Sequence, residues 1–319
     1  MSVIEALFSE KIEPNLAPLE GYRKKVQRSY IIFILAFVAA IIFGGIMVAK
    51  QNPWFMIPVA AIFIFMAIIG VKAYRQKKEY RAVFKNTVIA ELVKRVNPTW
   101  SYDPNKMINP EIYVHSNLFT EPFDRYNGDD FVSGVIEKTD FECSELHTEY
   151  KEVRYNNKGQ REEHWVTIFK GLFFHADFNK NFNGSTFVLP DFSEKIFGKF
   201  GQIFQKIMGP YQLVKLENID FEKKFVVYST DQIEARYILT PTMMEAILRI
   251  SNLHNYTVRF AFVGSRIYCA LSILKDLFEP KIFSKAINLK DAESMYNLLK
   301  LNEIIIQELN LNTRIWTKL

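Results

Sequence analysis

Two long runs of hydrophobic residues dominate the first third of the chain. Residues 30–49 give twenty consecutive positions without a charge, and residues 53–71 give nineteen more. An α-helix rises ~1.5 Å per residue, so each run spans about 30 Å, the thickness of the hydrocarbon core of a bilayer. Only three residues separate the runs. The pattern therefore predicts a transmembrane hairpin with two antiparallel helices.

A soluble alternative would be a pair of buried core helices. Such helices normally carry a polar stripe, and neither run has one. A cleaved signal peptide fits poorly, because the first run begins only at residue 30 and is too long. Neither run contains an ionisable residue, which argues against a proton relay, a transporter or a voltage sensor. We therefore interpret the hairpin as an anchor.

The orientation of the hairpin follows from the cations at its ends. The turn between the runs holds the single cation Lys50, whereas both outer flanks are basic. These flanking cations are Arg23, Lys24, Lys25, Arg28, Lys72, Arg75, Lys77, Lys78 and Arg81. Because cytoplasmic flanks carry the excess of Lys and Arg, both termini are expected in the cytoplasm. The chain should be a multi-pass protein of the plasma membrane.

Helical patterns continue on both sides of the hairpin. Residues 1–29 form an amphipathic segment that opens with a capping-box spacing at Ser2 and Glu5 and is broken by Pro14. This segment could lie in the membrane interface or pack on the cytoplasmic domain. Residues 72–97 predict a basic helical stalk, since no Gly or Pro intervenes before Pro98. Its cations serve as the topology signal and could also attract anionic lipid headgroups.

From residue 98 onward the pattern changes to that of a mixed domain. A long β-hairpin is expected over 141–155 and 160–178, because both segments are rich in β-branched and aromatic residues. Further strands are expected at 131–138, 185–189, 212–216, 224–228, 257–263 and 266–273, with turns at Asn127-Gly128 and Asn183-Gly184. Helices are expected at 191–207, from Asp231, from Thr242 to about Leu253, and at 291–309.

Strands and helices mix without a regular β-α-β alternation, which is typical of the α+β class with a mainly antiparallel sheet. The complete prediction is an amphipathic segment over 1–29, a two-helix transmembrane hairpin over 30–71, a helical stalk over 72–97, and a cytoplasmic α+β domain over 98–319. Whether residues 98–319 form one domain or two packed halves, divided near Gly209-Pro210, stays open at this stage.

Charge and cysteine content narrow the function classes. The net charge of +5 comes entirely from residues 1–97, which hold 14 Lys and Arg against 6 Glu. Residues 98–319 hold 26 cations against 29 acids, a balance of −3, so nucleic acid is not expected as a partner. The two cysteines, Cys143 and Cys269, cannot form a disulfide framework and suit a reducing compartment.

The common catalytic and nucleotide-binding motifs are absent from the sequence. Asp177, Asn179, Asn181 and Asn183 alternate like the start of a calcium loop, but Phe182 and Val188 occupy the positions that need Gly and Glu. This segment is better read as a strand end followed by an Asn-Gly turn. No cofactor is expected.

A second candidate for metal binding lies on one predicted strand, where alternate residues share a face. These residues are Cys143, Glu145, His147 and Glu149. One strand cannot surround a metal with adjacent ligands, and only His164 and His175 on the next strand could complete the set. Two ordinary polar strand residues are the simpler interpretation, so no metal is expected.

Six charged residues remain as candidates for a binding surface or an unrecognised catalytic site. They are Lys170, Asp177, Lys180, Asp231, Glu234 and Arg236. Helix capping explains Asp231 and Glu234, and a salt bridge explains Arg236, without any functional role. A cleft that gathers these side chains with perturbed acids would favour an enzyme.

Three blocks of sequence are familiar as a set. They are FKGLFFHADFNKNFNG at 169–184, VVYSTDQIEARYILTP at 226–241 and LNLNTRIW at 309–316. With the preceding hairpin, they resemble an uncharacterised bacterial family, domain of unknown function 3137. The resemblance implies a bacterial membrane protein with a cytoplasmic domain and no established activity. It also implies genomic company with coiled-coil membrane-associated proteins of the LemA type, and it supplies no catalytic residues.

The leading functional hypothesis is a non-enzymatic binding or scaffold module held at the inner face of the plasma membrane. Its expected partners are the lipid bilayer, a protein such as a LemA-type protein, and anionic lipid headgroups. The competing hypothesis is a membrane-tethered enzyme of unrecognised type, with its site near the blocks 169–184 and 226–241.

Overall fold

The computed structural model describes residues 3–50, 54, 56–156, 158–178, 181–191, 211–252 and 256–309. The chain divides into two compact units. A helical unit comprises residues 1–96 together with 278–297, and a sheet unit comprises residues 97–277 together with 298–319.

The helical unit opens with an unbroken series of helical turns. Helix α1 (Val3–Leu7) is followed by a π-helical turn (Phe8–Ile12), a 3₁₀ turn (Glu13–Asn15) and helix α2 (Leu16–Lys50). Pro14 was expected to break the helix, but it lies in the 3₁₀ turn and the chain stays helical around it. The fixed φ of proline suits the start of the next helix, where its missing N–H costs nothing.

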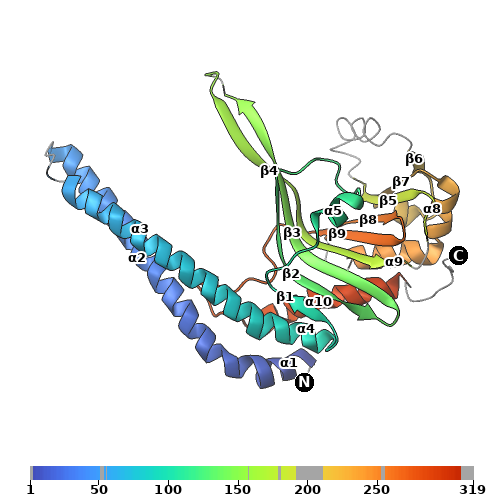
Figure 1. Ribbon diagram of the computed structural model, residues 1–319, viewed down its shortest axis with the longest axis horizontal. Helices are drawn as coiled ribbons and strands as arrows, with labels where there is room; N and C mark the ends of the chain where they lie inside the picture. The colour runs from blue at the N-terminus through green and yellow to red at the C-terminus, as the bar shows by residue number, and fades with distance from the viewer. Residues whose placement is uncertain are drawn as a thin grey trace. The chain divides into compact units, whose positions relative to one another are not determined.

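The second half of the hairpin begins with helix α3 (Met56–Phe84). A π-helical turn (Lys85–Ile89) and helix α4 (Ala90–Val96) extend it, so the stalk expected over 72–97 is helical. Figure 1 shows α2 and α3 running side by side as a long antiparallel pair. A hydrogen bond of 2.7 Å from the Ser29 hydroxyl to the Gln76 amide oxygen joins the two helices.

The apolar parts of α2 and α3 are largely exposed. In the most hydrophobic window of each helix, only 6% and 17% of residues are buried. Exposed side chains include Ile34, Leu35, Ile41, Ile64 and Ile68. Both helices are long and apolar enough to cross a membrane. A pair of core helices would hide these side chains, whereas most of them are exposed in the described part of this chain.

Residues 278–297 join the helical unit although they lie far along the sequence. Tyr80 on α3 donates a hydrogen bond of 2.9 Å to the carbonyl of Lys281. Near the start of α2, the Glu20 carboxylate accepts a hydrogen bond of 2.8 Å from the amide of Ala286. Arg23 donates one of 2.9 Å to the carbonyl of Ile282. These contacts connect the C-terminal segment to both helices of the hairpin.

The sheet unit is built on a nine-stranded sheet in the order β1-β2-β3-β4-β9-β8-β5-β7-β6. The strands are β1 (Ser101–Asp103), β2 (Arg125–Ile136), β3 (Thr139–Tyr155), β4 (Arg161–Asp177), β5 (Ser185–Pro190), β6 (Gln212–Val214), β7 (Phe225–Ser229), β8 (Thr257–Val263) and β9 (Arg266–Ser272). Every neighbouring pair is antiparallel. The α+β class with a mainly antiparallel sheet is confirmed.

The two hairpins expected from the sequence are present as β3–β4 and β8–β9. Asn127-Gly128 was expected to be a turn ahead of the strand at 131–138, but β2 begins at Arg125 and the pair lies inside it. The chain reverses after Ile136, where Glu137 adopts a φ of 57°. A register shift between Asp129 and Val132, with Asp130 at a φ of 54°, lets β2 run through a bulge.

Short helices complete the sheet unit. They are α5 (Pro110–His115), α7 (Ile219–Glu222), α8 (Gln232–Ile238), α9 (Pro241–Asn252) and α10 (Leu289–Glu308), whose second half belongs to this unit. Thr242 was expected to cap α9, but the Thr240 hydroxyl accepts the hydrogen bond from the amide of Met243. Pro241 then occupies the first helical position, which suits its fixed φ. The helix expected over 191–207 lies outside the described residues, apart from Asp191.

The central strands are buried on both faces. One face carries a cluster with many aromatic residues, in which Tyr113 of α5 packs against Phe169 and Phe173 of β4. Residues of the opposite parity, such as Phe174 of β4 and Cys269 of β9, are also fully buried. Strands that are buried on both faces have nearly continuous hydrophobic sequences, as β4 and β9 do in their central parts.

Candidate functional site

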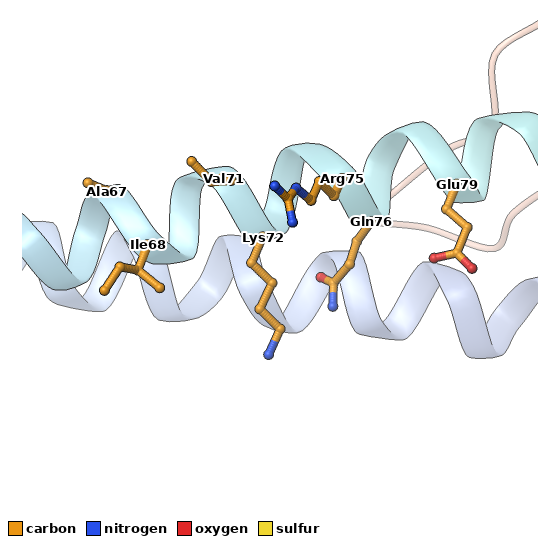
Figure 2. A pocket seen from close by; sticks show the side chains of 7 residues that line it. All are labelled: Ala67, Ile68, Val71, Lys72, Arg75, Gln76 and Glu79. Atoms are coloured by element: carbon orange, nitrogen blue, oxygen red, sulfur yellow. The ribbon is translucent and has the colours of Figure 1, made fainter.

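Two grooves open beside α3 where its apolar run gives way to charge. The first, here called the Lys72 groove, has a volume of about 550 Å³ and is lined by Ala67, Ile68, Val71, Lys72, Arg75, Gln76 and Glu79. Figure 2 shows that all seven lining side chains come from α3, with Lys72, Gln76 and Glu79 extending on the side where α2 runs. It contains both cations and an acid.

The second groove, here called the Tyr74 groove, has a volume of about 410 Å³. It takes side chains from both α2 and α3, which are Tyr30, Phe33, Gly70, Ala73, Tyr74, Lys77, Lys78 and Arg81. A Cβ atom at Gly70 would lie 3.7 Å from the Phe33 ring, an ordinary van der Waals distance, so α3 packs against α2 at this point. The lining is apolar at one end and carries three cations and no acid at the other.

A carboxylate lies beside the last of these cations. The Glu279 Oε1 atom is 2.5 Å from the Arg81 guanidinium and 3.2 Å from the Lys85 ammonium. The Lys85 side chain is only 2% exposed, so its charge is held in place by surrounding protein. Glu279 therefore holds Arg81, which lines one end of the Tyr74 groove.

The three candidate residues near α8 stabilise the local fold. Asp231 caps the helix, with its carboxylate accepting from the amides of Ile233 and Glu234. The Glu234 carboxylate accepts hydrogen bonds of 3.0 and 2.8 Å from the amides of Asn183 and Gly184. Arg236 donates to the carbonyl of Gln232 within the helix. The expected capping role of Asp231 is confirmed, and Glu234 holds the 183–184 turn against α8.

Of the other three candidates, Lys170 and Asp177 lie apart from each other. Lys170 and Asp177 both lie on β4, but they are seven residues apart, about 23 Å along a strand, and their parity places them on opposite faces. The Lys170 ammonium forms an ion pair of 2.7 Å with Asp276. Lys180 lies outside the described residues.

The histidines that could have completed a metal site lie away from Cys143. His175 is paired with Glu142, so its side chain is on the face opposite Cys143 and Glu145. His164 is paired with Glu152, far along the β3–β4 hairpin. Burial raises the pKa of the Cys143 thiol to about 12, so this sulfur remains protonated at neutral pH.

His175 belongs to a polar network that sequence reasoning missed. Its Nε2 atom lies 3.0 Å from Glu142 Oε2, and its Nδ1 atom lies 3.0 Å from Arg266 Nη1. Arg266 also donates a hydrogen bond of 2.7 Å to Asp140. A guanidinium can only donate, so Nδ1 accepts and Nε2 donates to Glu142. Both ring nitrogens are occupied, and this hydrogen bond is the main reason that the pKa of Glu142 is below its ordinary value.

Glu145 is a buried carboxyl group of the sheet unit whose pKa is strongly raised. Burial raises its pKa to about 8, and the nearby carboxylate of Asp129 adds to the effect. Its side chain accepts a hydrogen bond of 3.2 Å from the amide of Leu277. A buried carboxyl group that is neutral near pH 7 is common at functional sites. The perturbation alone does not define a site.

Arg259 on β8 is a second buried ionisable group without an obvious chemical role. Its guanidinium carbon lies 4.8 Å from the centre of the Phe119 ring. Burial lowers its pKa from the ordinary value, and the nearby carboxylate of Glu121 opposes that shift. The Phe119 and Tyr113 rings are stacked at 5.3 Å, so the cation lies against the aromatic cluster of the sheet.

Comparisons with known proteins add a family without an assigned activity. A family model described as "Protein of unknown function (DUF3137)" matches residues 167–311, which confirms the resemblance inferred from the sequence. No curated protein sequence matches the chain significantly.

Among solved structures, the mycobacterial trehalose monomycolate transport factor A is similar over 67% of this chain and 93% of its own. The identity is 10% and the TM-score is 0.34. Similarity at this level carries no argument about fold or function.

Proposed function

We propose that this chain, whose residues 167–311 match the DUF3137 family model, is a binding module anchored at the cytoplasmic face of the plasma membrane. The observation that carries the proposal is the exposure of apolar side chains along α2 and α3. Soluble proteins rarely leave so large an apolar surface in water, because its transfer from water to lipid is strongly favourable.

The proposed topology places both chain ends in the cytoplasm. The single cation Lys50 lies between the two spans, whereas the outer flanks carry nine cations. Alkaline phosphatase fused after Glu10 or after Leu319 should therefore be inactive, and a cytoplasmic reporter at the same positions should be active. Phosphatase activity from either fusion would contradict the topology.

The anchor itself is tested by fractionation. Deleting residues 30–71 should move the rest of the chain from the membrane fraction to the soluble fraction. The intact chain should stay in the membrane at high salt, because two inserted spans do not depend on screened charges. If the intact chain is released by salt, the hairpin is not the anchor.

The binding surface for a protein partner is proposed to be the outer part of the β3–β4 hairpin. Figure 1 shows this arm extending beyond the neighbouring strands. β2 pairs with β3 only as far as Glu149, and β9 pairs with β4 only from Gly171. The arm exposes Tyr155 (72%), Val153 (41%) and Trp165 (38%) among charged residues. Exposed aromatic side chains with a charged rim are typical of protein interfaces.

A pulldown from native membranes tests the partner. The intact chain should retain one or more membrane-associated proteins, with a LemA-type protein as the expected candidate, and a chain truncated in the arm should lose them. Substitutions at the six candidate residues of the sheet unit serve as the comparison. Loss of the partner in those variants, and not in the truncated arm, would move the binding surface to Lys170, Asp177 or α8.

The alternative of a membrane-tethered enzyme has less support. It requires a cleft in which several of the candidate side chains meet. Lys170 and Asp177 lie on opposite faces of β4, while Asp231 and Glu234 accept hydrogen bonds from backbone amides. The arrangement of these described residues favours a binding role.

A further inference from the structure

The Tyr74 groove lies at the level where a membrane changes from acyl chains to headgroups. Val71 is the last residue of the uncharged run in α3, and the groove extends from Gly70 to Arg81 across that point. Phe33 and Ala73 line its apolar part. Tyr30 and Tyr74 belong to the residue type that is enriched at membrane–water interfaces.

The polar part of the Tyr74 groove is strongly cationic. Lys77 and Lys78 line it, and neither ammonium has an acidic partner among the described residues. Arg81 is held at the end of the groove by its ion pair with Glu279. Two unpaired ammonium groups beside tyrosine hydroxyls match the charge and the hydrogen-bonding needs of a phosphate group.

The Lys72 groove on the same helix provides the contrast. It is lined from α3 alone, and Glu79 adds a negative charge to its lining. An anionic group would meet two cations and one acid there. The Tyr74 groove offers three cations, no acid in its lining and apolar contacts from both helices.

From these observations we propose that the Tyr74 groove binds one anionic phospholipid, with the phosphate at Lys77 and Lys78 and the upper acyl chain against Phe33 and Ala73. The inference rests on the proposed membrane anchoring and names the lipid class that the anchor selects. Phosphatidylglycerol has this chemistry, whereas phosphatidylcholine lacks the net negative charge.

The test uses the full chain purified in a neutral detergent. Native mass spectrometry measures the lipid retained after addition of phosphatidylglycerol or of phosphatidylcholine with the same acyl chains. One phosphatidylglycerol should be retained in preference to phosphatidylcholine. The double variant K77Q/K78Q should weaken that retention about tenfold or more, because each cation near a headgroup contributes to the attraction.

The double variant K72Q/R75Q is the matched control, since it removes the same charge from the Lys72 groove. It should retain phosphatidylglycerol as the intact chain does. Equal losses in both variants would overturn the proposal and leave only a general attraction between charges. Competition by inorganic phosphate at concentrations similar to the lipid would also overturn it, because the acyl chain would then contribute nothing.

Membrane fractionation keeps this result separate from the anchoring itself. Both double variants keep the two apolar spans, so both should remain in the membrane fraction. A chain that leaves the membrane contradicts the proposed function, whereas a chain that stays but does not distinguish the two lipids contradicts the lipid site alone.

Discussion

Among the single residues, Glu145 has a buried carboxyl group that lies near a second carboxyl group, that of Asp129. Its side chain lies on β3 opposite Asp129 of β2, and the amide of Leu277 donates to it. Burial raises its pKa from 4.5 to about 8. The folded state therefore binds a proton that the unfolded state releases between pH 4.5 and pH 8. The contribution of Glu145 to the free energy of unfolding is therefore fully present below pH 4.5. It is lost as the pH rises to about 8.

Replacing Glu145 with Gln should remove this pH dependence. The amide keeps an acceptor for Leu277 and carries no charge, so E145Q should be more stable than the intact chain at pH 8 and nearly equal to it at pH 5. The slope for one proton is at most about 1.4 kcal/mol per pH unit. Thermal unfolding of the full chain in detergent, measured across this range, gives the comparison.

Glu217→Gln is the control for that experiment, because Glu217 is exposed on the loop before α7. It should follow the intact chain at every pH. If E145Q is less stable than the intact chain at pH 8, the carboxylate is charged and stabilising in the fold, and the assignment of a neutral acid is wrong.

Glu234 tests whether a candidate residue is structural or catalytic. Replacing it with Ala leaves the amides of Asn183 and Gly184 without their acceptor. The expected loss is about 2 kcal/mol in the free energy of unfolding, since unsatisfied backbone donors are costly. E234Q keeps one acceptor and should lose less. Unchanged unfolding of E234A would show that the carboxylate does not hold the turn and would return Glu234 to the list of functional candidates.

At the scale of elements, the β3–β4 arm shows how a long hairpin can have two roles. Its inner part is the centre of the sheet, and a bulge between Thr148 and Glu149 marks the change to the outer part. There the strands pair with each other, and Lys151 and Glu163 form an ion pair across them. Near the base of the arm, the guanidinium carbon of Arg125 on β2 lies 3.4 Å from the centre of the Trp165 ring.

The outer arm should therefore be dispensable for folding. Replacing residues 153–163 by a two-residue Asn-Gly turn between the paired residues Glu152 and His164 should change the unfolding temperature by only a few degrees, because exposed side chains and surface ion pairs contribute little to stability. A matched deletion cannot be made in the inner part without removing sheet contacts. A large loss of stability in the shortened chain would mean that the arm is part of the core.

At the scale of the whole molecule, residues 278–297 interrupt the sheet unit in sequence. They follow β9 of the sheet unit and lead into α10, yet they cluster with the hairpin helices. The chain leaves the sheet unit after Leu277 and returns to it at Leu298. A fragment of residues 98–319 keeps all nine strands but loses the partners of this segment, including Glu20, Arg23 and Tyr80.

The fragment 98–319 should still fold, because the complete sheet can bury a core of its own. Hydrogen exchange should then show a local change: the amide of Ala286, which donates to Glu20 in the full chain, should lose protection. Amides of β8 and β9 should exchange as they do in the full chain. An aggregated or molten fragment would mean that the helical unit completes the core of the sheet unit.

Local patterns in the sequence determined the elements of this protein. The apolar runs gave the two long helices, and the β-branched and aromatic segments gave the two hairpins. Asp231 and Glu234 predicted the start of α8 because a helix cap depends on neighbouring residues. The short strand β1 and helix α5 were missed, since a few residues carry too weak a period.

Only the tertiary structure decided what these elements do with their side chains. Glu234 accepts hydrogen bonds from a turn fifty residues away, and His175 lies on the face opposite Cys143 because of strand register. The Tyr74 groove needs side chains from two helices, and its last cation is fixed by Glu279 from near the end of the chain. Contacts between residues far apart in sequence depend on packing, and no local period encodes them.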